Sequence, residues 1–259
     1  MKIGQNNIHL TDTGGDKPAL LFVHGILMDH TVWDQQVDAF SDTHRVVCVD
    51  LRGFGASSSD SPSISMEDHC DDLIAVVDGL GLRDVTLVGW SMGGSIAQVM
   101  GARPDAPFDR YVLVDTTPQL IASDEFPHAL PGEAAQQLGG LMAEDFAQGC
   151  AAFCSMIEPQ DEAVTGRLTA IAAATNFDVA MTTFATAGGR SLLDALPQIS
   201  KPTTVICGRN DAICLPQASE AIAAAVPGCD GSVVWIEDAG HAPFMVQANA
   251  FNVALRAAL

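Results

Sequence analysis

Residues 85–94 read VTLVGWSMGG, an apolar run that leads into a G-x-S-x-G pentapeptide. The run Val85–Val88 is typical of a buried strand, and the pattern after the pentapeptide, to Ala102, is helical. The pentapeptide therefore predicts a sharp turn from strand to helix, with Ser91 strained at its tip. The flanking glycines fit this turn because larger side chains would collide with the neighbouring strand or helix. Such a turn presents Ser91 as a nucleophile and places the amide of Met92 at a helix N-terminus, where it can stabilise an oxyanion.

Short apolar runs alternate with helical patterns along most of the chain. The predicted buried strands cover residues 19–23, 45–49, 85–88, 111–114, 203–207 and 232–236. Two extended pieces, Lys2–Gln5 and Ile8–Asp12, precede them and are predicted to be joined by a turn at Asn6-Asn7. Buried strands that alternate with helices indicate an α/β fold with a mostly parallel sheet covered on both faces.

The alternation stops at Pro118 and resumes near residue 199. Residues 118–198 are rich in Ala, Met, Leu and Phe at helical spacing. We therefore expect a helical lid, or cap, inserted after the sixth predicted strand into a core made of residues 1–117 and 199–259. This lid segment (residues 118–198) holds two basic residues, Arg167 and Arg190, against ten acidic ones, a net charge of −8.

The composition limits the partners and the compartment. The 259-residue chain has a formal net charge of −20, which repels nucleic acid and anionic membranes. No apolar run reaches the ~20 residues of a membrane span, and the first residues are polar rather than signal-like. Seven cysteines, mostly within apolar runs, indicate reduced thiols. We expect a cytoplasmic protein that binds neither nucleic acid nor membrane; its acidity fits either a high-salt habitat or an ordinary acidic enzyme.

Two further side chains can complete the chemistry of the serine. A serine hydroxyl needs a base to take its proton, and the base needs an acid to fix its tautomer. Asp211, in the loop GRND, and His241, in the loop DAGHAPF, each follow a predicted strand, where the loops of a parallel sheet gather. We therefore expect Ser91 as nucleophile, His241 as base and Asp211 as acid. Asp115, at the end of strand 111–114, is the alternative acid.

These motifs, in this order, resemble those of the α/β-hydrolases over essentially the whole chain. His24-Gly25, the stretch DLRGFGAS at residues 50–57 and the acid and base loops all have counterparts there. The resemblance implies an α/β-hydrolase fold with a triad in the order Ser91, Asp211, His241, and it favours the Gly-x-x-Asp loop of Asp211 over Asp115. It also implies that the amide of Ile26 joins that of Met92 in an oxyanion hole. Structural roles are expected for His24, Asp50 and Arg52.

No cofactor or metal is expected. The chain has no zinc-binding H-E-x-x-H spacing, no phosphate-binding P-loop and no G-x-G-x-x-G motif. Serine at position 91 argues against the dehalogenase and epoxide-hydrolase branches, which have aspartate there.

The motif set resembles that of small bacterial carboxylesterases, including pimeloyl-carrier-protein methyl esterase, and of lactonases and perhydrolases. We therefore expect hydrolysis of small to medium acyl esters through an acyl-enzyme. A lactonase acting on acyl-homoserine lactones or enol-lactones, a perhydrolase and a non-enzymatic ligand receptor or signalling protein are the alternatives. The sequence leaves the oligomeric state open.

The lid segment narrows the choice of substrate. Its negative charge would repel an acyl-carrier protein, which is itself acidic, and multiply anionic small molecules. A small-molecule ester or lactone of low charge is therefore the expected partner. We expect substrate contacts from Trp90, Phe126 and Phe146. The apolar side chains of the lid segment that could line an acyl pocket are Leu120, Ile121, Phe126, Leu138, Leu141, Met142, Phe146, Phe153, Met156, Phe177, Met181 and Phe184.

Overall fold

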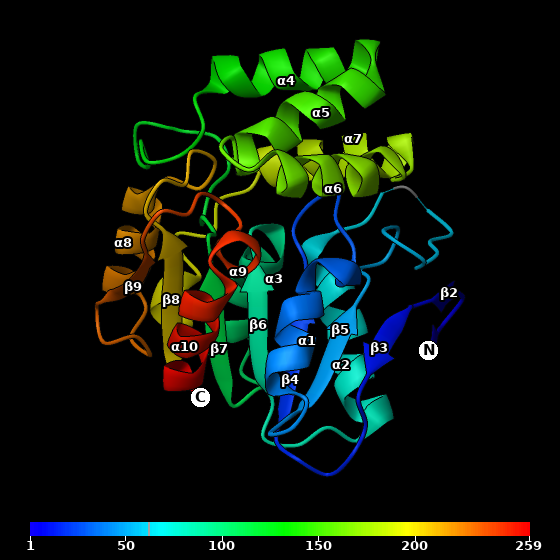
Figure 1. The fold of residues 1–259 in the computed structure, drawn as a ribbon, viewed down its shortest axis with the longest axis vertical. Coiled ribbons are helices and arrows are strands. Elements are labelled where there is room, and N and C mark those ends of the chain that lie inside the picture. Colours follow the sequence, from blue (N-terminus) through cyan, green and yellow to red (C-terminus); the bar gives the residue numbers. More distant parts are fainter. Residues whose placement is uncertain (62) are drawn as a thin grey trace.

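A computed structural model describes residues 1–61 and 63–259 of the chain, and a seven-stranded sheet lies at its centre (Figure 1). The strand order is β3-β5-β4-β6-β7-β8-β9. β3 runs antiparallel to β5, and every other pair of neighbours is parallel. The sheet is therefore the mostly parallel one that the sequence predicted. Its strands are β3 (Leu10–Asp12), β4 (Ala19–Val23), β5 (Arg45–Val49), β6 (Thr86–Trp90), β7 (Arg110–Val114), β8 (Thr203–Gly208) and β9 (Val233–Ile236).

Helices cover both faces of this sheet. On one face α1 packs against α10, and both lie in front of the strands in Figure 1, while α2 packs against α3 on the other face. All residues of β4 and β6 are buried, because a strand covered on both sides exposes neither set of alternate side chains. The helices of the core are η1 (His30–Trp33), α1 (Asp34–Phe40), α2 (Met66–Leu80), α3 (Met92–Gly101), η2 (Leu196–Gln198), α8 (Pro216–Ala225), α9 (Pro243–Val246) and α10 (Ala248–Ala258).

Local signals in the sequence set the ends of α2. Ser65 accepts a hydrogen bond from the amide of Asp68, and the Asp68 side chain accepts one from the amide of Ser65, which makes a reciprocal capping box. The helix stops at Gly81, whose φ of +59° is favourable for glycine.

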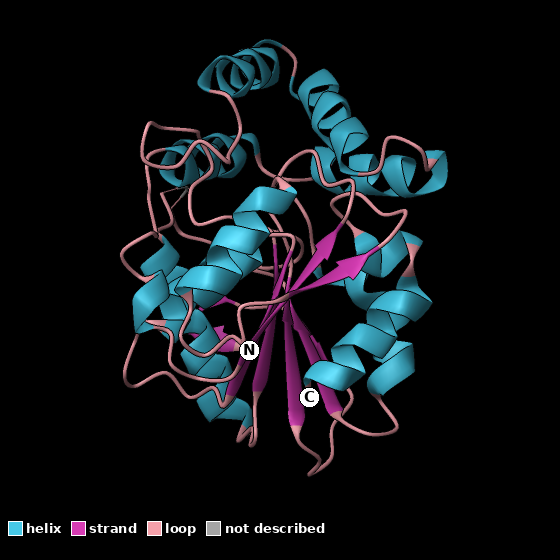
Figure 2. Ribbon diagram, turned by 90° about the vertical axis from the view of Figure 1, so that its left-hand side faces the viewer, coloured by secondary structure: helices cyan, strands magenta, loops and turns pink. Residues whose placement is uncertain are grey.

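The lid segment forms a layer of helices over the carboxyl ends of the strands (Figures 1 and 2). Its helices are α4 (Gly132–Glu144), α5 (Phe146–Ile157), α6 (Glu162–Ala173) and α7 (Phe177–Gly188). α4 packs on α5, and α5 packs on α6. Two ion pairs join this layer to the core: Arg167 with Asp34 at 2.9 Å, and Arg190 with Glu67 at 2.6 Å. Both basic residues of the segment are thus used to attach it.

The predicted position of the turn near the N-terminus was wrong. Asn6–Asn7 is not the turn but strand β2, which pairs with β1 (Lys2–Ile3) in a separate two-stranded sheet. The chain reverses at Gly4-Gln5 instead, because Gly4 adopts a φ of +58°, which glycine tolerates without steric cost. The N-terminal residues form one strand more than the sequence predicted. The lid segment therefore follows strand β7 (Arg110–Val114), which is the sixth of the predicted strands.

In the part of the chain that the structure covers, residues 1–61 and 63–259, no helix combines the length and the apolar character needed to cross a membrane.

Candidate active site

The turn between β6 and α3 holds Ser91 in a strained backbone conformation. Ser91 has φ 54° and ψ −117°, which is uncommon for a residue with a side chain. A Cβ on Gly89 would lie 2.3 Å from the carbonyl oxygen of Gly93, and one on Gly93 would lie 2.4 Å from the carbonyl oxygen of Val23. Both contacts involve backbone atoms, which have no rotamer to move away. The glycines of the pentapeptide are thus required by close approach of three chain segments.

A threonine that follows the neighbouring strand β7 stabilises this turn. The Thr116 hydroxyl donates to the carbonyl oxygen of Ser91 at 2.8 Å. A Cβ on Gly94 would lie 2.5 Å from the Thr116 Cβ, so a glycine is needed there as well. Thr116 was not singled out in the sequence, because its role depends on β7 lying beside β6.

The structure brings His241 and Asp211 together. His241 Nδ1 lies 2.8 Å from Asp211 Oδ2, and both side chains are buried. The second carboxylate oxygen, Oδ1, accepts from the amides of Ile213 at 2.8 Å and Cys214 at 3.0 Å. These bonds hold Asp211 with Oδ2 facing the imidazole. His241 Nδ1 therefore carries the proton of the bond, which leaves the lone pair on Nε2.

His241 Nε2 is buried and has no hydrogen-bond partner among the described residues. Buried polar atoms are almost always paired, so an unpaired one calls for a functional explanation. The Trp90 side chain, next to Ser91 in the chain, lies against this histidine: its Nε1 donates to the His241 carbonyl oxygen, and the two rings are 5.5 Å apart. His241 thus sits beside the serine turn with a free basic nitrogen.

Cys214 lies close to the serine, the acid and the base. It lines the cavity that contains Ser91, and potential ligand atoms of Cys214, Asp211 and His241 lie within 4.8 Å of one another. Burial raises the pKa of the Cys214 thiol well above its usual range, so the side chain stays a neutral thiol. Cys214 could not be selected from the sequence, because it lies three residues beyond Asp211 in an irregular loop.

Asp115, the alternative acid, lies beside Asp211 rather than beside the histidine. Its Oδ1 accepts from the amide of Gly208 at 2.8 Å, and ligand atoms of Asp115, Cys207 and Asp211 lie within 4.8 Å of one another. Burial, together with the negative charge of Asp211, raises the pKa of the Asp115 carboxyl well above its ordinary value. These surroundings therefore favour the protonated form of Asp115.

The loop after β4 lies on the other side of Ser91. Ile26 and Met92 both line the cavity beside the serine. Met92 is the first residue of α3, so its amide has no carbonyl acceptor within the helix. His24 supports the loop: its Nδ1 donates to the Gly25 carbonyl oxygen at 2.7 Å, and its Nε2 accepts from the Leu51 amide at 3.0 Å. Burial lowers the pKa of the His24 imidazole, which matches this neutral tautomer.

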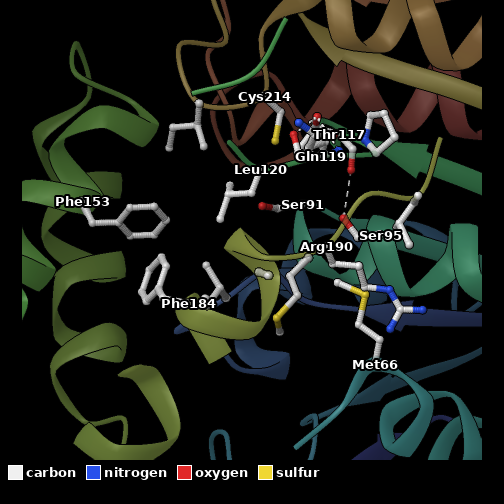
Figure 3. A pocket seen from close by; sticks show the side chains of 16 residues that line it. Met66, Ser91, Ser95, Thr117, Gln119, Leu120, Phe153, Phe184, Arg190 and Cys214 are labelled. Atoms are coloured by element: carbon white, nitrogen blue, oxygen red, sulfur yellow. Dashed lines mark hydrogen bonds between the residues drawn. The ribbon is translucent and has the colours of Figure 1, made fainter. Parts of the chain in front are cut away.

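Two cavities lie between the core and the lid segment. The smaller, about 50 Å³, contains Ser91, and Figure 3 shows Ser91 and Cys214 pointing into it, with the rings of Phe153 and Phe184 on the opposite side. The larger, about 320 Å³, lies under α4 and is lined almost entirely by apolar side chains. The two cavities share Leu120, Phe153, Phe184 and Ile213, so these residues form the wall between them.

The three aromatic residues expected to contact substrate lie elsewhere. Trp90 is 1% exposed and packs against Trp33 and Phe244 in the core. Phe126 is buried in a small cluster with Ala129 and Ala218, and Phe146 packs edge-on against Phe177. Among the described residues none of the three lines either cavity.

Within residues 1–61 and 63–259, three groups of side chains bring potential metal ligands within 4.8 Å of one another. Two contain Asp211, which is bonded to His241 and to two amides, as described above. The third consists of His9, His30 and Asp50, in which His30 Nδ1 lies 2.7 Å from Asp50 Oδ1.

Comparisons with known proteins agree with this architecture. A family model described as "Alpha/beta hydrolase family" matches residues 20–254. A pimeloyl-[acyl-carrier protein] methyl ester esterase of Stenotrophomonas maltophilia is 28% identical over 254 residues, which cover 95% of this chain and 94% of that protein. A 3-oxoadipate enol-lactonase of Acinetobacter baylyi is 31% identical over 105 residues, 40% of this chain and 39% of that protein. The structure of an esterase from Exiguobacterium antarcticum superposes with a TM-score of 0.90 at 20% identity, over 97% of this chain and 95% of that one.

Proposed function

Because the chain belongs to the α/β-hydrolase family, we propose that it is an enzyme that hydrolyses carboxylic esters with Ser91 as nucleophile, His241 as base and Asp211 as acid. The observation that carries this proposal is the Asp211–His241 hydrogen bond of 2.8 Å together with the unpaired His241 Nε2 beside a strained serine turn. The esterase relative, aligned over nearly the full length of both chains, supports the class of reaction.

The first half-reaction forms an acyl-enzyme. Ser91 Oγ attacks the carbonyl carbon of the ester while His241 Nε2 takes the hydroxyl proton. The amides of Ile26 and Met92 donate to the negative oxygen of the tetrahedral intermediate. The C–O bond to the leaving group then breaks, and the imidazolium of His241 returns the proton to the departing alcohol. Asp211 stays ionised throughout and stabilises the imidazolium.

The second half-reaction releases the acid. A water molecule takes the place of the alcohol, His241 Nε2 removes its proton, and the hydroxide attacks the acyl carbonyl. Collapse of the second tetrahedral intermediate breaks the bond to Ser91 Oγ, which takes the proton back from His241. The products are the free carboxylic acid and the unmodified enzyme. Ser91 and His241 are not bonded to each other in the described structure, and such bonds commonly form only with substrate bound.

The cavities support acyl groups of small to medium size. A volume of about 320 Å³ lies at the low end of the roughly 300–1,000 Å³ of ligand pockets. The apolar lining suits an aliphatic chain that passes Phe153 and Phe184 on its way from Ser91. We place the acyl group there, and we replace the expected contacts of Trp90, Phe126 and Phe146 by those of Leu120, Phe153 and Phe184.

The charge of the lid segment disfavours an acyl-carrier protein as substrate. Its exposed acidic residues would face that acidic partner, and its two arginines are already paired with the core. The exposed ones are Asp124, Glu125, Glu133, Glu144, Asp145, Glu162, Asp178 and Asp194.

A Ser91→Ala variant tests the mechanism. We expect it to fold normally but to lose turnover of p-nitrophenyl acetate and butyrate, and we expect an organophosphonate to label Ser91 in the parent protein. Labelling of another serine, or full activity of the variant, would refute the assignment. A single slow burst in the parent protein, without turnover, would instead favour a ligand receptor.

Lactone hydrolysis is the second candidate, because it follows the same steps with a leaving alcohol that stays attached to the acyl group. The enol-lactonase relative supports it over part of the chain. A panel of open-chain esters, γ-lactones and acyl-homoserine lactones separates the two: a preference for lactones over every open-chain ester would make the protein a lactonase. Adding hydrogen peroxide to the same panel tests for perhydrolysis.

A further inference from the structure

Three consecutive amides of the loop that carries His241 donate to the end of α5 in the lid segment. The amide of Gly240 is shared between the two carboxylate oxygens of Glu158, at 3.0 and 3.1 Å. The amide of Ala242 donates to Glu158 Oε1 at 2.9 Å, and the amide of His241 donates to the Ile157 carbonyl oxygen at 3.0 Å. The amides of this loop, including that of the proposed base, are thus held from the lid segment, while the His241 carbonyl oxygen accepts from Trp90 of β6.

Glu158 is unlike the other acidic residues of its segment. It is only 6% exposed, and burial raises the pKa of its carboxyl, although the bonds from Ala242 and Gly240 act in the opposite direction. Its own backbone is fixed, since the Glu158 carbonyl oxygen accepts from the Thr165 hydroxyl at 3.0 Å and from the Asp161 amide at 3.1 Å. A buried carboxylate at a helix end is costly unless its partners compensate for the lost water.

The approach of the two segments is too close for any side chain at position 240. A Cβ on Gly240 would lie 2.5 Å from the Ile157 carbonyl oxygen and 3.0 Å from Glu158 Oε2. A glycine is therefore needed before His241, because only a residue without a side chain lets the base loop approach Ile157 and Glu158 this closely.

We propose that Glu158 is a positioning residue for His241, which couples the lid segment to the base loop. The inference rests on the proposed function, because it assumes that His241 is the base. Asp211 orients the imidazole from its Nδ1 side, and Glu158 fixes the backbone from which the imidazole projects. The end of α5 and the base loop consequently move as one unit, so lid movement that admits substrate has to occur elsewhere in the segment.

Loss of the carboxylate would leave the amides of Gly240 and Ala242 buried without acceptors. The loop would shift to hydrate them, and a displacement of about 1 Å at a catalytic group costs on the order of 10²-fold in rate. The loss should appear in kcat more than in KM, because Glu158 does not line either cavity among the described residues.

The experiment compares Glu158→Ala, Glu158→Gln and Glu162→Gln. Glu162 is an exposed glutamate four residues away, so its variant controls for loss of charge in the segment. We expect kcat on p-nitrophenyl butyrate to fall on the order of 10²-fold in Glu158→Ala. The fall should be smaller in Glu158→Gln, because its one remaining carbonyl oxygen can take the position of Oε1 and accept both amides. Glu162→Gln should be unchanged.

Proton NMR provides a readout that does not depend on turnover. The low-field resonance of the His241 Nδ1–H bonded to Asp211 should shift or broaden in Glu158→Ala and Glu158→Gln and remain unchanged in Glu162→Gln. Folded Glu158 variants with parental kcat and an unchanged resonance would refute the inference. If Glu158→Ala does not fold, Glu158→Gln decides by the same two measurements. If the resonance is present in the parent protein and perturbed in the Glu158 variants but the parent protein hydrolyses no ester, the contact of Glu158 with the His241 loop is confirmed and the proposed function fails.

Discussion

The carboxyl pair Asp211 and Asp115 makes the sharpest test of the proposed triad, because the two residues lie close together and Asp211 is the one bonded to His241. In Asp211→Asn an amide faces His241 Nδ1, so the imidazole turns to the wrong tautomer and Nε2 can no longer take a proton. Losing the triad acid in this way costs about 10⁴-fold in kcat, which is about 5.4 kcal/mol at ~1.36 kcal/mol per tenfold. We expect Asp211→Asn to lose activity on this scale.

Asp115→Asn should behave in the opposite way. The pKa of the Asp115 carboxyl is raised by burial, which favours its neutral form, and an asparagine keeps an oxygen for the Gly208 amide and offers N–H groups towards Asp211. The backbone φ of 40° at this position is also one that asparagine tolerates. We expect kcat/KM to stay within about threefold of the parent value, since a neutral donor replaces a neutral donor of the same shape.

The same substitution should stabilise the protein at neutral pH. The folded pKa of Asp115 is raised, so above the unfolded value of ~3.9 the unfolded chain releases a proton that the native protein keeps. Stability then falls by about 1.36 kcal/mol per pH unit until the folded pKa is reached. Asparagine removes this loss, so the gain in Asp115→Asn should be small at pH 4 and larger at pH 7.

Steady-state kinetics and thermal unfolding at the two pH values measure both effects. A loss of activity in Asp115→Asn that exceeds the loss in Asp211→Asn would show that the acid follows β7 and not β8. A stability difference that shrinks as the pH rises would show that Asp115 is ionised in the native protein.

Two further predictions concern substrate choice. Gly139→Leu should shift the preference in a p-nitrophenyl ester series towards shorter acyl chains, because Gly139 lines the larger cavity and a Cβ there meets open space; Gly140→Leu, also open but outside the cavity lining, is the matched control. Equal chain-length profiles for the two variants would contradict the assignment of that cavity. A half-ester with a free carboxylate should be hydrolysed more slowly than its neutral diester at low salt, and the gap should narrow at high salt, because the screening length falls from ~10 Å at 0.1 M to ~3 Å at 1 M. A preference for the anionic half-ester at low salt would refute the charge argument.

The sequence alone was enough to predict the roles of residues that depend only on their near neighbours in the chain. The serine turn and the strands before it depend on neighbours within a few positions, and the alternation of strands and helices then indicates a parallel sheet. The fold was therefore predicted correctly, whereas the two-residue strands β1 and β2 are too short to show any period. Asp211 and His241 could be proposed as partners because parallel strands bring the loops at their carboxyl ends together.

The walls of the cavities depend on how helices dock, which a single sequence does not encode locally. Phe126, Phe146 and Phe153 are equally apolar in the sequence, yet only Phe153 faces the cavity of Ser91. Trp90 lies in a strand that is buried on both faces, so alternation could not tell which face it occupies. Glu158 stands in a polar stretch that reads like an ordinary exposed turn, and only the packing of α5 against the base loop reveals its partners.

The net charge of the lid segment can be counted from the sequence, but the positions of its charged side chains are known only from the structure. The net value of −8 gives every ionised residue equal weight. In the structure Arg167 and Arg190 neutralise acidic residues of the core, and Glu158 is buried against amides, so the exposed carboxylates belong to the outer surface. Beneath that surface the larger cavity is almost wholly apolar, whereas the cavity of Ser91 also has polar side chains and Arg190 in its lining. Repulsion should therefore act mainly on large anionic partners and on the approach of small ones, while selection among neutral esters is left to the shape of the apolar cavity.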